Sequence, residues 1–143
     1  MSPIAAAEAF ERAPGLAEQV GDGDADIVLL RARELIAGMT EPERIAVLNA
    51  HPRIGATDGL SARSAAEQRA AETATDATLA ELTRLNDAYE RRFGFRFVVF
   101  VAGRSRADIV PVLRARLERT RAEELAAGID AFLEIARDRL TRG

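Results

Sequence analysis

The stretch TRAEELAAGIDAFLEIARDRL, residues 120–140, decides the fold class. Thr120 followed three positions later by Glu123 is a capping box, the pattern that begins a helix. The apolar residues that follow are spaced as on one helix face: Leu125, Ile129, Phe132, Leu133, Ala136 and Leu140. The stretch therefore predicts an amphipathic helix over residues 121–141.

Helix signals of the same kind recur upstream. Thr40 and Glu43 form a second capping box with Pro42 in its first turn, and Gly38 ends the helix before it. Ala is abundant and β-branched runs are scarce, so we expect a single all-α domain over residues 1–143, a bundle of about six to eight helices. The predicted helices lie near 24–38, 40–50, 61–75, 76–92, 106–118 and 121–141.

Two of these helices carry residues of particular interest. The helix near 24–38 is indicated by four apolar residues: Ile27, Leu30, Leu35 and Ile36. In the helix near 76–92, Asn86 falls in the same stripe as Leu79, Leu82 and Tyr89. Because a buried amide needs hydrogen-bond partners, we expect Asn86 to hold a neighbouring loop.

The segment FRFVVFV, residues 95–101, is the one strand-like stretch. It is short and has no obvious pairing partner, so an extended buried connection is the alternative to a strand. Ser105 or Asp108 begins the next helix, and we expect Pro111 in its first turn.

Composition excludes several classes of protein. The 143 residues are 48% hydrophobic and 30% charged, with a net charge of −3 and no basic stripe, which argues against nucleic-acid binding. No cysteine is present, which excludes disulfides and thiolate metal sites and is compatible with the cytoplasm. No apolar run approaches the roughly 20 residues of a membrane span, and we expect no signal peptide.

His51 is the only histidine, and it stands where a helix meets the loop HPRIGATDGL, residues 51–60. Pro52 disfavours helical geometry at His51, so the helix should end there. A histidine at such an edge is suited to acid–base chemistry near neutral pH. The alternative is a surface histidine or one satisfied within the core.

Three polar side chains follow on the predicted helix near 61–75. Ser64 and Glu67 project from one face, with Gln68 one step around it. Glu67 could exchange a proton with His51, whereas Ser64 and Gln68 could hydrogen-bond a substrate. A solvated helix face is the alternative.

Arginines near the loop are candidates for binding an anion, because guanidinium groups suit carboxylates. They are Arg53, Arg96 and Arg104, and a surface charge is the alternative for each. One histidine among scattered carboxylates gives no recognisable metal-ligand spacing, so we predict no metal site.

In chain order, four strings resemble the OHCU decarboxylase family, enzymes of urate breakdown that act on 2-oxo-4-hydroxy-4-carboxy-5-ureidoimidazoline. They are HPRIG at 51–55, LSARSAAEQ at 60–68, LNDAYERRFGFRFVVFV at 85–101 and the closing RAEEL and IARDRL. The resemblance covers residues 47–140. The order of HP, S-x-x-E-Q and N-x-x-Y-x-x-x-F-G-F is what makes it specific.

The resemblance implies an all-helical enzyme, often dimeric, that needs no cofactor and forms (S)-allantoin from a small-molecule substrate. It implies that His51 and Glu67 are the central catalytic pair. The residues that it implies around the substrate are Pro52, Ser64, Gln68, Phe95 and Phe97, with the backbone of Phe93-Gly94-Phe95 shaping the pocket.

The sequence departs from the family pattern at two positions. Family members usually carry a basic residue nine positions after the first Phe of F-G-F, where this chain has Ala102, and commonly carry Pro where it has Arg96. We expect Arg96 to replace the missing cation, because in an extended segment it would share a face with Val98, Phe100 and Ala102. Two alternatives stay open: another ureido or carboxylated heterocycle as substrate, or a non-catalytic helical interaction module.

Overall fold

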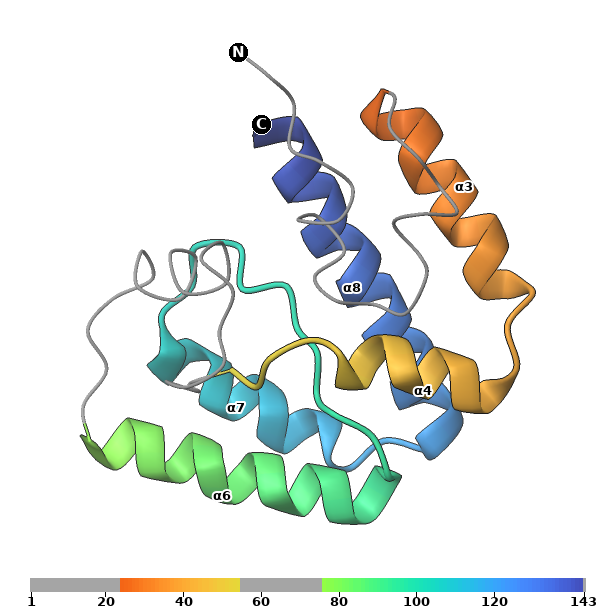
Figure 1. The fold of residues 1–143 in the computed structure, drawn as a ribbon. Helices are drawn as coiled ribbons and strands as arrows, with labels where there is room; N and C mark the ends of the chain where they lie inside the picture. The colour runs from red at the N-terminus through yellow and green to blue at the C-terminus, as the bar shows by residue number, and fades with distance from the viewer. Residues whose placement is uncertain (1–23, 55–75, 143) are drawn as a thin grey trace.

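The computed structural model describes residues 24–54 and 76–142. These residues form five helices and no strand, which confirms the all-α prediction. The helices are α3 (Ala25–Ala37), α4 (Glu41–Asn49), α6 (Asp76–Phe93), α7 (Arg106–Arg116) and α8 (Arg121–Arg142). In Figure 1, α3 lies along α8, α4 crosses at the base of that pair, and α6 and α7 lie side by side below.

The predicted capping boxes begin two of these helices. The Thr40 hydroxyl accepts from the Glu43 N–H and the Glu43 carboxylate accepts from the Thr40 N–H. Thr120 and Glu123 make the same reciprocal pair ahead of α8. The predicted helix near 61–75 lies outside the described residues, so the five described helices are fewer than the six to eight predicted.

Two details of the sequence prediction are wrong. Pro111 lies inside α7 rather than in its first turn, because Ser105, paired with Asp108 in a capping box, begins the helix earlier. On α3, Ile27 and Leu30 are exposed, 45% and 58%, although they were expected in the apolar stripe. The buried face is Val28, Ala32 and Ile36, at steps of four residues, because this is the face that α3 presents to α8.

The segment 95–101 is an extended connection and not a strand, which confirms the alternative that the sequence left open. Phe95, Phe97 and Val98 are buried in the core. Gly94 precedes the segment with a φ of 80°, a left-handed conformation that favours glycine, and so turns the chain away from α6.

Helix α4 approaches α8 closely at Gly128. A Cβ atom built on Gly128 would lie 3.0 Å from Leu48 Cδ1 and 3.2 Å from Cδ2, and Leu48 is fully buried. The absence of a side chain at this position therefore sets the distance between the two helices.

We expect Gly128→Val to lower the free energy of unfolding by about 1–3 kcal/mol, because a larger side chain would overpack this contact. Chemical denaturation measures the loss. In combination with Leu48→Ala, which removes the opposing atoms, Gly128→Val should cost less than it does alone. Strict additivity of the two substitutions would show that Gly128 and Leu48 are not coupled.

Candidate active site

His51 lies just beyond the C-terminal end of α4, as the sequence predicts. Its N–H donates to the Leu48 carbonyl at 3.1 Å, so the chain leaves the helix in a tight turn. The residue is half-buried and its Nδ1 atom is buried. His51 therefore stands at the edge of the core.

The loop after His51 is fastened to α6 by an arginine. The Nε of Arg53 donates to Glu90 Oε2 and its Nη2 to Asp87 Oδ1, both at 2.7 Å. The hydrogen bond with Glu90 is the main cause that raises the pKa of Arg53 above its ordinary value. Arg53 is thus committed to two carboxylates of the protein and is a poor candidate for holding a substrate anion.

Asn86 on α6 also holds this loop, as predicted for a buried amide. Its side chain is 1% exposed, and Nδ2 donates to the Ile54 carbonyl at 3.3 Å. The Ile54 side chain is itself in the core. The loop 51–54 is therefore attached to α6 through its backbone as well as through Arg53.

Arg96 also holds the chain at His51 through hydrogen bonds. Its backbone N–H donates to Asn49 Oδ1 at 3.0 Å, and its Nη1 donates to the carbonyls of Asn49 at 3.0 Å and His51 at 2.7 Å. Carbonyls at the end of a helix lack intrahelical partners and attract a cation. Arg96 is thus bound beside His51 and is not a free surface charge. Its Nε is buried and has no hydrogen-bond partner within 24–54 and 76–142.

Phe97 and Val98 are consecutive and both buried, so the protein covers the segment 95–101 on more than one side at this point. Ala102 lies in an exposed turn with a φ of 52°. Arg104 is exposed, and its guanidinium donates to the Phe100 and Val101 carbonyls. Of the three candidate arginines, Arg96 is the one that lies against His51.

Phe95 and Phe97 belong to the core through their side chains. Their rings surround Tyr89, with centroids 6.1 Å and 5.2 Å from it. Side chains of other helices hold the backbone here, since Arg121 donates to the Phe93 carbonyl at the end of α6 and Arg116 to the Val98 carbonyl within the segment. What Phe95 and Phe97 can offer a ligand near His51 is therefore their backbone.

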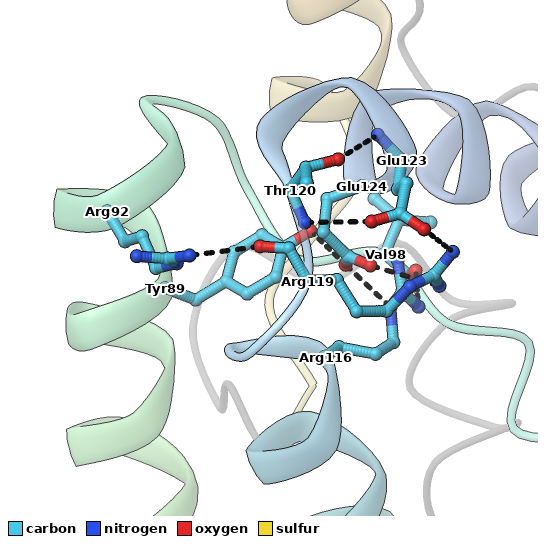
Figure 2. Close-up of polar contacts among 8 residues, drawn as sticks. All are labelled: Tyr89, Arg92, Val98, Arg116, Arg119, Thr120, Glu123 and Glu124. Carbon is cyan, nitrogen blue, oxygen red and sulfur yellow. Dashed lines mark hydrogen bonds and ion pairs between the residues drawn. The ribbon is translucent and has the colours of Figure 1, made fainter.

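Behind this segment lies a buried polar network that joins α6, α7 and α8 (Figure 2). Glu124 is fully buried, and its Oε1 accepts from the Tyr89 hydroxyl and from Arg116 Nε, both at 2.7 Å. Arg119 pairs with the other carboxylate oxygen at 3.1 Å. Burial, followed by the hydrogen bond to Glu124, raises the pKa of Tyr89 well above its usual range, so the hydroxyl stays protonated and donates.

Sequence reasoning did not single out this network. A signal for Glu124 exists: with Gly128, Ala131 and Ile135 it follows steps of four, three and four along α8, on a buried stripe. A charged residue in such a stripe needs a partner in the core. The sequence does not reveal that the partners are Arg116 and Tyr89.

Ser64, Glu67 and Gln68 lie outside the described residues, so the predicted pairing of Glu67 with His51 stays a prediction. A cavity of about 410 Å³ lies between α3 and α4 and includes none of the predicted site residues. Within 24–54 and 76–142, no three His, Asp or Glu side chains are grouped as metal ligands would be. The helices described there include none with the length and apolar character of a membrane span.

Comparison with known proteins gives a family whose fold and motifs match these observations. The family model described as OHCU decarboxylase matches residues 4–141 of this chain. The chain belongs to the OHCU decarboxylase family. The resemblance read from the sequence strings is thereby confirmed.

Two curated relatives carry names from the same chemistry. A 2-oxo-4-hydroxy-4-carboxy-5-ureidoimidazoline decarboxylase of Haloferax volcanii is 26% identical over 139 residues, covering 93% of this chain and 83% of the relative. The uric acid degradation bifunctional protein PucL of Bacillus subtilis is 35% identical over 96 residues, or 66% of this chain. The match spans only 19% of that longer protein.

A solved structure described as OHCU decarboxylase in the presence of (S)-allantoin has the same fold, with a TM-score of 0.78. It is 24% identical in sequence, and the match covers 95% of this chain and 94% of that one. The likeness extends through nearly the whole length of both chains.

Proposed function

We propose that this chain converts 2-oxo-4-hydroxy-4-carboxy-5-ureidoimidazoline, abbreviated OHCU, into (S)-allantoin and CO₂ in urate breakdown. The observation that carries the proposal is the match to the OHCU decarboxylase family over residues 4–141. The geometry adds a histidine held at the edge of the core beside an arginine.

The reaction can proceed without a cofactor, because the substrate itself takes up the electron pair. When the bond between the ring carbon and the carboxylate breaks, CO₂ leaves and the electron pair passes into the conjugated ring of the substrate. A proton must then be added to one face of that ring. The protein has to hold the carboxylate out of the ring plane and to direct the proton, and both are tasks for positioned side chains. We therefore propose turnover without a cofactor or a metal.

In this proposal His51 and Glu67 form the catalytic pair that handles the proton. We propose that residues 61–75 form a further helix that carries Glu67, with Ser64 and Gln68 hydrogen-bonding the substrate. Pro52 and the backbone at Phe95 and Phe97 border the pocket. The attachment of loop 51–54 to both α6 and Arg96 supports this arrangement, because it gives His51 a fixed position.

Arg96 is proposed to bind the substrate carboxylate in place of a basic residue at Ala102. Its Nη1 is used by backbone carbonyls, but its buried Nε has no partner among the described residues. A guanidinium with a remaining donor beside His51 is suited to a carboxylate. In this arrangement Nη1 of Arg96 binds the protein backbone, and Nε binds the substrate carboxylate.

Kinetics on OHCU, made from urate by the two upstream enzymes, test this assignment. We expect Arg96→Ala to lower kcat/KM by at least about 10- to 100-fold, because it removes the proposed charge-assisted contact with the substrate as well as the hydrogen bonds to the Asn49 and His51 carbonyls. Arg104→Ala should leave kcat/KM unchanged, because Arg104 binds only its own turn among the described residues. If Arg96→Ala has full activity, the assignment is wrong. If the natural chain is inactive and Ala102→Arg creates activity, the natural substrate is a different carboxylated heterocycle.

We further propose that residues 1–143 form one domain, that the protein acts in the cytoplasm, and that it assembles as a homodimer. The family resemblance supports the dimer, and sedimentation equilibrium tests it. A mass equal to one chain of 15.5 kDa across the concentration range would exclude the dimer.

A further inference from the structure

Arg53, Asp87 and Glu90 form two ion pairs that join loop 51–54 to α6. Two hydrogen bonds of 2.7 Å join one guanidinium to two carboxylates that lie three residues apart on α6. The three side chains are 28%, 50% and 31% exposed. Ion pairs that are exposed to this extent contribute little to folding, so the cluster's main effect should be local.

Locally, the cluster determines where loop 51–54 lies on α6. Arg53 is two residues beyond His51, with the rigid Pro52 between them, so a shift of Arg53 would be passed on to the histidine. Asn86 and the Ile54 side chain anchor only the far end of the loop. Arg96 anchors the His51 carbonyl on the near side. Arg53 attaches the part of the loop that lies between these two contacts.

We propose that Arg53 is a positioning residue for His51, which acts through Glu90 and Asp87 and does not touch the substrate. The inference rests on the proposed function, in which His51 carries the chemistry. A displacement of a catalytic group by about 1 Å can cost about 100-fold in rate. The substrate would bind much as before, since no substrate contact is removed.

Kinetics of Arg53→Gln test the proposal, with Arg84→Gln as matched control. Arg84 is on α6, the helix that carries Asp87 and Glu90. Among the described residues its hydrogen bonds go only to Glu81 and not to the loop. For Arg53→Gln we expect kcat to fall about 10- to 100-fold with KM changed by less than about threefold. The thermal midpoint should move by less than about 4 °C. Arg84→Gln should keep the wild-type kcat.

A double-mutant cycle tests whether Arg53 acts on His51 through the carboxylates of α6. Because Arg53 acts through the carboxylates, Arg53→Gln combined with Glu90→Gln should be little worse than Arg53→Gln alone. If the losses of kcat in the two single variants multiply in the double variant, the proposal is contradicted. A rise in KM with kcat unchanged would also overturn it, because Arg53 would then be a substrate contact.

A measurement without substrate separates this inference from the proposed function. His51 is the only histidine, so the Cε1–H group of its ring gives a single, unambiguous ¹H–¹³C signal in NMR. We expect this signal to shift or broaden in Arg53→Gln and to stay in place in Arg84→Gln. An unmoved signal in Arg53→Gln overturns the positioning role, whereas a wild-type protein that does not consume OHCU overturns the proposed function.

Discussion

Replacing His51 by Asn is expected to lower the turnover of OHCU by about 10²- to 10⁴-fold, the usual contribution of a general acid or base. Asparagine retains a polar side chain of similar size but has no group that exchanges a proton near neutral pH. Glu67→Gln, which removes the proposed partner charge, is expected to have an effect of similar size. Steady-state consumption of OHCU measures both.

Both variants should remain folded. His51 is half-buried at the end of α4, and the contacts that fix its loop come from Arg53, Asn86 and Arg96. We therefore expect the free energy of unfolding to change by less than about 1 kcal/mol. Loss of folding in both variants would mean that the polar motif is structural, as in a non-catalytic helical module.

The largest expected effect on stability belongs to Glu124. Glu124→Ala would leave Arg116, whose side chain is 12% exposed, without its carboxylate and would leave the Tyr89 hydroxyl without its acceptor. Breaking a buried ion pair by removing one partner costs about 3–5 kcal/mol, because the remaining charge is not compensated. We expect a loss of that size in chemical denaturation.

Two further variants make the Glu124 result interpretable. Glu134→Ala removes an exposed glutamate from the same helix and should leave the denaturation midpoint almost unchanged. Tyr89→Phe removes only the hydroxyl that donates to Glu124 and should cost about 1–3 kcal/mol. A Glu124→Ala protein as stable as Glu134→Ala would show that the buried network contributes nothing to folding.

Local sequence signals predicted the features that depend on neighbours along the chain. The capping boxes at Thr40 and Thr120 correctly located the beginnings of α4 and α8. Pro52 correctly marked the end of the helix at His51. The polar Asn86 in an apolar stripe correctly indicated a buried amide that holds a loop. Each of these rests on backbone hydrogen bonding within a few residues or on the cost of burying one polar group.

Features that depend on tertiary packing were not predictable in this way. Ile27 and Leu30 are apolar, but the face of α3 that contacts α8 consists of Val28, Ala32 and Ile36. The contact of Arg96 with the His51 carbonyl joins residues 45 positions apart, and no local pattern in the sequence predicts it. Hydrophobic periodicity shows which residues could face a core, whereas the partner helix determines which ones do.

The central claim, that this chain is a decarboxylase that controls the addition of the proton, is tested most directly by the stereochemistry of the product. Urate is converted to OHCU by the two upstream enzymes, and the allantoin that forms is analysed by circular dichroism with and without this protein. We predict an excess of (S)-allantoin with the wild-type chain and none with His51→Asn, because protonation outside a chiral site favours neither face. The same mixture of enantiomers with and without the wild-type chain would contradict the account.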